Sequence, residues 1–215
     1  MSSERHYTSL DHFLCEAQNF LNLGSVKNHS ASRQNPANRL NEHALDDAEK
    51  NLSAALMRVN HAGEVAAQGL YLGQSLTAKT QETRRQMRDA AREEGDHLHW
   101  CAERLEELDS HTSYLDPLWY AGSVAIGCIA GKAGDRWSYG FVEETEQQVM
   151  QHLEGHLEKL PPQDEKSRAI IEQMKHDEAE HAAKAKAFGA SDLPKPVKAL
   201  MSLTAKVMTT GARYI

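Results

Sequence analysis

The sequence predicts an all-α protein built on a four-helix bundle, and three observations lead to this expectation. Apolar residues at helical spacing cover most of the chain beyond residue 40, and no strand-like alternation of useful length occurs. One pattern of acidic residues and histidine is present twice, as Glu64 followed by Glu94-x-x-His97 and as Glu146 followed by Glu178-x-x-His181. Turn-forming residues lie midway within each copy of this pattern, as two antiparallel helix pairs require.

The expected elements follow from apolar spacing and from Gly, Pro, Ser and Asn clusters. The N-terminal part comprises an amphipathic helix over Tyr7–Leu23 and a linker over Gly24–Asn38. The first two bundle helices span Asp46–Leu76 and Gln81–Asp109, and an apolar stretch after Pro117 then passes through a glycine-rich break into a third helix that ends near Leu160. A fourth helix spans Asp164–Phe188, and a last helix spans Lys195–Arg213. We therefore expect residues 1–40 to form a short helix and linker, and residues 41–215 to form the bundle with its extra C-terminal helix.

The positions of the turns support the pairing of the acidic residues. Residues that face each other across an antiparallel helix pair are equally far from the turn. Lys79 is the midpoint between Glu64 and Glu94, within the short stretch Thr77–Thr80. Pro162 is the midpoint between Glu146 and Glu178, and the pair Pro161-Pro162 is incompatible with a helix interior.

Helical phase places these acidic residues within apolar faces. Residues three apart on a helix lie about 60° apart around its axis, so each Glu-x-x-His pair points both side chains the same way. Glu94 shares a face with Met87, Leu98 and Cys101, and Glu178 shares one with Ile171 and Met174. Glu146 shares a face with Val142, Val149 and Leu153, whereas Glu143 and Glu144 lie off it. Since a carboxylate in a core needs a partner or a metal, Glu146 is the better candidate.

The six residues form a known type of metal-ligand set. A lone Glu on each of two helices and Glu-x-x-His on each of the other two are the ligands of di-iron and di-manganese bundles. Carboxylates with few imidazoles and no thiolates favour iron or manganese over zinc or copper(I), and we expect two iron ions per chain, with manganese less favoured. Such a centre activates O2 for insertion of one oxygen atom, and the cycle needs two electrons from an external donor.

Composition excludes several other classes. The net charge of −7 argues against a nucleic-acid-binding protein, whose footprint is usually basic. Cys15, Cys101 and Cys128 have no Cys-x-x-Cys spacing and are expected to be reduced thiols. The N-terminus has neither the apolar stretch of a secretory signal nor the Arg-rich, acid-poor composition of a transit peptide. The nearly uncharged stretch Pro117–Gly131 is too short for a membrane-spanning helix of about 20 residues.

The last predicted helix suggests a membrane surface as partner. Its apolar face and its basic side lie opposite each other, and no acidic residue follows Asp192. The apolar face comprises Val197, Leu200, Met201, Thr204, Val207 and Met208, and the basic side comprises Lys195, Lys198, Lys206 and Arg213. A basic amphipathic helix on an acidic protein is typical of an interfacial membrane contact, although a helix packed on the bundle with solvated lysines has the same pattern.

Several weaker sequence patterns have more than one interpretation. A single Glu-x-x-His is more typical of a surface pair than of a ligand pair, so the argument depends on the duplication, the turn positions and the helical phase. Gly127-x-x-x-Gly131-Lys132 is one residue short of a phosphate-binding loop and lacks its Ser or Thr, so a glycine-rich apolar helix or helix break is the better interpretation. His61 and His152 lie near Glu64 and Glu146, where they are candidates for orienting ligands or are ordinary polar histidines.

Several motifs together resemble the signature of the demethoxyubiquinone hydroxylases. They are Arg58-Val59-Asn60-His61-Ala62-Gly63-Glu64, Leu70-Tyr71-Leu72-Gly73-Gln74, Glu94-Gly95-Asp96-His97-Leu98, Pro117-Leu118-Trp119, Gly131-Lys132 and Asp177-Glu178-Ala179-Glu180-His181. The resemblance covers about Asp46 to the C-terminus. Asn60 and Leu153 depart from the residues, Asp and often Tyr, that many members have at these positions, and neither position is a ligand.

This resemblance implies a ferritin-like bundle that hydroxylates a polyprenylated methoxybenzoquinol late in ubiquinone synthesis. It also implies that Glu64, Glu94, His97, Glu146, Glu178 and His181 bind iron, and it pairs Glu146 with His152 six residues later. We expect a peripheral protein on the cytoplasmic face of the inner membrane, with no nucleic-acid partner, and as a homo-oligomer or with an accessory protein of the pathway. The rivals are a ferritin-type iron-storage or ferroxidase protein and a di-iron hydroxylase acting on another substrate, such as a tRNA base.

Overall fold

The computed structural model describes residues 31–41 and 43–215, and these residues contain helices but no strand. The elements are η2 (Pro36–Arg39), α2 (Asp47–Thr77), α3 (Gln81–Glu107), α4 (Asp116–Lys132), α5 (Asp135–Leu157), α6 (Glu165–Ala187) and α7 (Lys195–Tyr214). The predicted all-α class and the four bundle helices are confirmed. The helix predicted over Tyr7–Leu23 lies outside the described residues.

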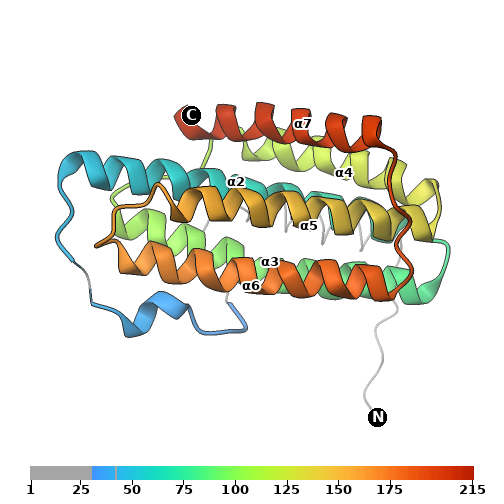
Figure 1. Cartoon of the computed structure of the whole chain (residues 1–215), viewed down its shortest axis with the longest axis horizontal. Coiled ribbons are helices and arrows are strands. Elements are labelled where there is room, and N and C mark those ends of the chain that lie inside the picture. Colours follow the sequence, from blue (N-terminus) through green and yellow to red (C-terminus); the bar gives the residue numbers. More distant parts are fainter. Residues whose placement is uncertain (1–30, 42) are drawn as a thin grey trace, which may run out of the picture.

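The helices form three layers (Figure 1). The middle layer holds α2 and α5, and the lower layer in this view holds α3 and α6, so that these four helices make the bundle. A third layer of α4 and α7 covers α2 and α5 on the side away from α3 and α6. The connection from α3 to α5 therefore runs through an additional helix, α4, before the second half of the bundle begins.

Local chemistry explains where the bundle helices begin. Asp46 and Glu49 form a reciprocal capping box at the start of α2, with hydrogen bonds of 2.9 and 3.0 Å. Thr80 caps α3, and its backbone N–H and hydroxyl also donate to Asp135 at the start of α5. Asp164 caps α6 directly after the two prolines and forms a buried ion pair with Arg104 at 2.9 Å. Both predicted turns therefore lie where the sequence placed them.

Glycines allow α4 to lie directly on α2. A Cβ atom at Gly73 would be 2.2 Å from the carbonyl oxygen of Val124, and one at Gly127 would be 2.2 Å from that of Leu70. Neither position can carry a side chain while the two backbones are this close. Gly127 and Gly131 both lie within α4, which confirms the interpretation of this motif as a glycine-rich apolar helix.

The segment 31–41, most of which was expected to be part of a linker, packs against the bundle. Ala37 in η2 is buried in the main apolar cluster with Leu56, Trp100 and Ile170. Asn35 caps η2 and donates to Glu103 of α3 at 2.8 Å. Buried apolar area and polar contacts thus fix this segment to α3 and α6, which composition alone does not reveal.

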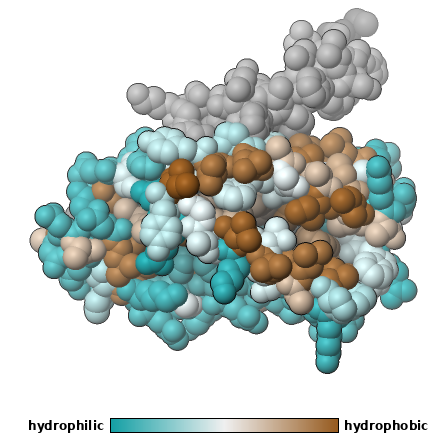
Figure 2. Space-filling model, turned by 90° about the horizontal axis from the view of Figure 1, so that it is seen from above, coloured by the Kyte–Doolittle hydropathy of each residue, from teal (hydrophilic) through white to brown (hydrophobic). Residues whose placement is uncertain are grey.

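Apolar side chains gather on the outer face of α4 and α7. Figure 2 shows this face, and its exposed large residues include Leu118 and Ile129 of α4 and Leu200, Leu203 and Val207 of α7. In the first turn of α7, part of the predicted basic side faces the bundle, because Lys198 pairs with Glu144 of α5 at 2.9 Å, and it also pairs with Asp192 before the helix at 2.8 Å. No helix in the described part of the chain has both the length and the hydropathy needed to cross a bilayer.

Candidate metal centre

The four bundle helices bring all six predicted ligands into one buried cluster. α2 contributes Glu64, α3 contributes Glu94 and His97, α5 contributes Glu146, and α6 contributes Glu178 and His181. Two overlapping groups have ligand atoms within 4.8 Å of one another: Glu64, Glu94, His97 and Glu178, and Glu94, Glu146, Glu178 and His181. Each member is at most 4% exposed. The groups share Glu94 and Glu178, so the cluster could hold two neighbouring cations.

Glu94 and Glu178 each span the two imidazoles. His97 Nδ1 lies 2.9 Å from Glu94 Oε2 and 3.2 Å from Glu178 Oε1. His181 Nδ1 lies 2.9 Å from Glu94 Oε1 and 3.0 Å from Glu178 Oε2. Each carboxylate therefore turns one oxygen toward each imidazole, which is the geometry of a bridging ligand. Glu64 completes the His97 half, and Glu146 completes the His181 half.

The outer nitrogen of each imidazole meets a carboxylate from another helix. His97 Nε2 lies 2.8 Å from Asp177 Oδ2, and His181 Nε2 lies 2.6 Å from Glu93 Oε2. A carboxylate on the second nitrogen fixes the tautomer and the orientation of a metal-binding histidine. Both imidazoles are therefore oriented with Nδ1 toward the cluster.

Buried carboxylates shift the acid–base properties of the centre. Burial, together with the neighbouring Glu94 and Glu178, raises the pKa of Glu64 and that of Glu146 well above the usual range. Burial also acts to raise the pKa of Glu94, but hydrogen bonds with His181 and His97 outweigh it and lower this pKa.

The imidazoles shift in the opposite direction. Burial acts to lower the pKa of His181, but hydrogen bonds with Glu178 and Glu94 raise it to about 12. The pKa of His97 is likewise raised, by Asp177, Glu178, Glu64 and Glu94 against the effect of burial. The raised pKa values mean that protons on these side chains balance the negative charge of the four buried carboxylates. Bound cations would balance the same charge. This donor set fits two divalent cations.

Tyr71 joins the His181 half of the cluster. It lies on α2 two turns after Glu64, is 2% exposed, and donates its hydroxyl to Glu146 Oε1. Burial and the nearby carboxylates raise its pKa well above the usual range, so the hydroxyl keeps its proton. Tyr71 therefore restrains the carboxylate of Glu146.

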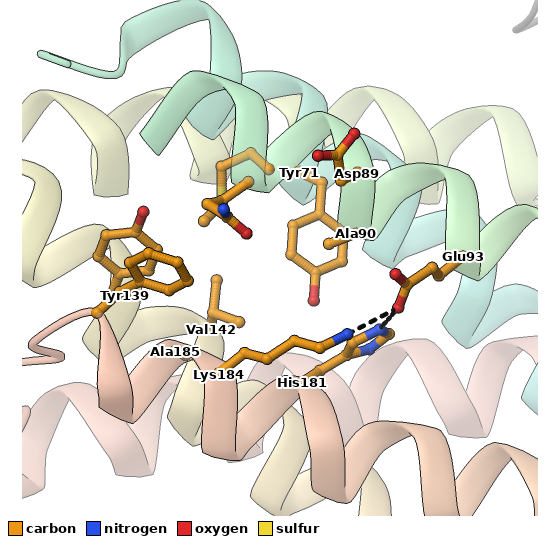
Figure 3. Close-up of a pocket in the computed structure, with 12 residues that line it drawn as sticks. Tyr71, Asp89, Ala90, Glu93, Tyr139, Val142, His181, Lys184 and Ala185 are labelled. Atoms are coloured by element: carbon orange, nitrogen blue, oxygen red, sulfur yellow. Dashed lines mark hydrogen bonds and ion pairs between the residues drawn. The ribbon is translucent and has the colours of Figure 1, made fainter. Parts of the chain in front are cut away.

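A cavity of about 50 Å³ borders the His181 half (Figure 3). Its inner wall includes Tyr71, Val142 and His181, and Glu93 and Lys184 lie at its rim, joined to each other at 3.3 Å. Its exposed residues are Lys184 of α6 and Phe188 directly after α6, and half-buried residues of α3 lie opposite them, so it opens between α3 and α6, on the side away from α4 and α7. A small molecule could approach the cluster here.

The two other histidines singled out by the sequence lie elsewhere. His61 is fully buried against α4, with Nδ1 3.2 Å from Asp116 Oδ2. His152 packs on His156, with ring centroids 4.0 Å apart, and His156 Nδ1 lies 2.8 Å from Asn60 Oδ1. None of these contacts reaches the six candidate ligands. The orienting groups are instead Asp177, Glu93 and Tyr71, whose roles depend on contacts between helices.

The bundle and its cluster are typical of one class of protein, the helical-bundle metalloproteins with a carboxylate-rich site for two cations. Comparison with known proteins is more specific: residues 51–212 match the family model of the ubiquinone biosynthesis protein COQ7, and the chain belongs to this family.

Several relatives that carry the name 3-demethoxyubiquinol 3-hydroxylase align over most of the chain. The protein of Nitrosococcus oceani is 51% identical over 211 residues, which are 98% of this chain and 99% of the relative. That of Cupriavidus pinatubonensis is 58% identical over 187 residues, covering 86% and 90% of the two chains. That of Coxiella burnetii is 51% identical over 214 residues, covering 100% and 99%. These alignments agree with the family resemblance of the sequence motifs.

Proposed function

We propose that this chain is an O2-dependent di-iron monooxygenase that hydroxylates the ring of a polyprenyl methoxy-methyl-benzoquinol, demethoxyubiquinol, late in ubiquinone biosynthesis. The observation that carries the proposal is the pair of overlapping ligand groups within a member of this family. The names of the relatives supply the reaction and the substrate class.

In this proposal, Glu64, Glu94, His97, Glu146, Glu178 and His181 hold two iron ions. Iron is preferred over manganese because the reaction is redox chemistry with O2, and the donor set suits both metals. When bound, the iron pair supplies activation of O2 for insertion of one oxygen atom, with two electrons from an external donor. Asp177 and Glu93 orient the imidazoles, Tyr71 holds Glu146, and the bundle keeps water from the buried carboxylates.

The exposed apolar face of α4 and α7 supports the proposal that the protein acts at a membrane surface, on the cytoplasmic face of the inner membrane. Leu200, Leu203 and Val207 are each 59–63% exposed on one helix, and such a concentration of apolar side chains is typical of an interaction surface. A polyprenyl substrate resides in the bilayer, so this face would bring the enzyme to it.

A ferritin-type storage protein remains the alternative to be excluded by experiment. Its soluble shell would have little use for the apolar face of α4 and α7, and the matched relatives are named as hydroxylases. Neither the family nor the surface favours iron storage.

The decisive experiment is an isoprenoid-quinone profile of cells that lack this protein. Accumulation of the demethoxy precursor, reversed by the wild-type chain but not by Glu178→Ala, is the expected result. Normal ubiquinone in these cells would contradict the proposed reaction. Vesicle flotation separates the membrane proposal from the chemistry: Leu203→Glu with Val207→Glu should reduce binding to lipid, while the control Lys132→Gln at the end of α4 should leave it intact.

A further inference from the structure

A short N-terminal segment closes the cluster on the His97 side. Arg33 Nε lies 2.9 Å from Asp96 Oδ2, and its Nη1 lies 2.8 Å from Asp177 Oδ2. Its Nη2 is 3.3 Å from His97 Nε2, and the guanidinium lies over the ring of Trp100, 4.9 Å from the centroid. Arg33, which precedes the bundle helices in the sequence, thus contacts both α3 and α6 beside the outer nitrogen of His97.

Arg33 fixes the carboxylate that orients His97. Asp177 accepts from Arg33 and, through Oδ1, from Gln173 Nε2 at 2.9 Å, and its Oδ2 meets His97 Nε2. These contacts use both oxygens, so Asp177 has little freedom to rotate. Ser32 adds two contacts to Asp96, from its backbone N–H at 2.6 Å and from its hydroxyl at 2.9 Å. The segment is therefore anchored by directed polar contacts on both sides of Arg33.

The charge of Arg33 is also needed there. Asp96 and Asp177 are buried carboxylates beside a cluster that already contains four, and Arg33 pairs with both. Removing the guanidinium, which is itself 39% exposed, would leave two largely buried carboxylates without their shared cation. The counterpart on the other half, Glu93, has a side chain that is 45% exposed and pairs with Lys184 at the surface.

We infer that Arg33 is a positioning residue for the metal centre, which holds Asp177 and through it His97, and so retains the cation of the His97 half. This inference rests on the dinuclear centre proposed above. Arg33 lies outside residues 51–212, which match the family model. The N-terminal segment is then part of the site.

The test measures iron retention in the full-length protein. Wild type, Arg33→Ala and Arg33→Lys are loaded with iron(II), the iron per chain is counted, and release to an excess of chelator is followed in time. We expect Arg33→Ala to lose one of its two irons about 10- to 100-fold faster than wild type, the size of effect typical of losing a group that orients a ligand. The other iron should leave at the wild-type rate. Arg33→Lys keeps one charge but cannot pair with Asp96 and Asp177 in the same way, so its rate should be intermediate.

Two controls separate positioning from loss of structure. Arg39→Ala changes an exposed residue at the end of η2 and should leave both release rates unchanged. Gln34→Ala changes the exposed neighbour of Arg33 in the same segment and keeps the guanidinium, so its release curve should resemble that of wild type. Urea unfolding of the metal-free variants reports any general destabilisation, which would speed the release of both irons equally.

The outcomes are distinct. Equal acceleration of both irons in Arg33→Ala, or no acceleration, would overturn the role of Arg33 while leaving the dinuclear centre in place. Wild-type protein that binds no iron would instead contradict the proposed function itself. Selective acceleration of one iron, partly reversed in Arg33→Lys, supports the inference.

Discussion

The two halves of the cluster have the same ligand pattern but different surroundings. In the His97 half, the orienting carboxylate Asp177 has an 11% exposed side chain and is held by Arg33. In the His181 half, the orienting carboxylate Glu93 is 45% exposed and is paired with Lys184, whereas cavities border both halves. The comparison teaches that a repeated sequence pattern fixes the ligands but not their accessibility, which depends on residues outside the repeat.

The largest loss of activity and of bound iron is expected from removing a carboxylate that both halves share. Glu178→Ala removes a carboxylate that spans both imidazoles, so it should abolish activity and bring bound iron well below two per chain. Circular dichroism should show that helical content mostly survives, because the change removes a buried charge from an otherwise intact bundle. Full iron occupancy in this variant would show that Glu178 is not a ligand.

Substitution of the unshared carboxylates should separate the halves. Glu64→Ala is expected to weaken the His97 position and Glu146→Ala the His181 position, because each belongs to one ligand group only. Each variant should retain about one iron per chain in elemental analysis, consistent with one intact position out of two. Loss of both irons in either variant would mean that the positions cannot be occupied independently.

The orienting carboxylates should differ in importance. Asp177→Asn is expected to weaken iron binding about 10- to 100-fold, because no other group can replace the buried carboxylate. Glu93→Gln should weaken it about 10-fold or less, because water can hydrogen-bond to His181 in place of the exposed carboxylate. Iron affinity measured by competition with a chelator compares them directly. If Glu93→Gln weakened iron binding more than Asp177→Asn, the interpretation that the His97 half depends more strongly on its orienting carboxylate would be wrong.

The prediction that involves no change in iron binding is a pH dependence of the metal-free protein. The pKa of His181 is raised to about 12 from its usual 6.5, so its contribution to stability is complete below 6.5 and is lost as pH rises toward 12. The free energy of urea unfolding should therefore fall between pH 7 and pH 10, by at most about 1.4 kcal/mol per pH unit for this imidazole. His181→Gln should make this slope shallower without removing it, because the pKa values of His97, Glu64 and Glu146 are raised as well. A slope unaffected by the substitution would exclude His181 as a source.

The fold could be predicted largely from local signals. The bundle helices begin within a few residues of the expected positions because caps and prolines act over short distances, as at Thr80 and Asp164. The six clustered residues could also be predicted, since helical phase and distance from a turn determine which side chains face one another. The packing of residues 31–41 could not be predicted, because the polar composition of this segment is typical of a linker and the residues that it contacts lie far away in the sequence.

Contacts between helices limited the prediction of the orienting groups. His61 is only one turn from Glu64, but α4 lies against it and supplies Asp116 as its neighbour. Glu93 and Asp177 each directly precede the Glu of a Glu-x-x-His motif, but each contacts the histidine of the other motif. Arg33 shows no distinctive spacing. Only a search for charged residues beside the ligand motifs would have drawn attention to Glu93 and Asp177.

The direct contact of α2 and α4 at Gly73 and Gly127 has a consequence for how the centre would sit beside a bilayer. α2 carries Glu64 toward the bundle interior and presents its glycines to α4, whose other side is apolar. Ordinary helix pairs are about 8–10 Å apart, and glycines bring the backbones to the short end of that range. In the proposed enzyme, the depth of the iron pair below the outer face of α4 would then be set by two closely packed helices, α2 and α4, and one added methyl group at either glycine would change that depth.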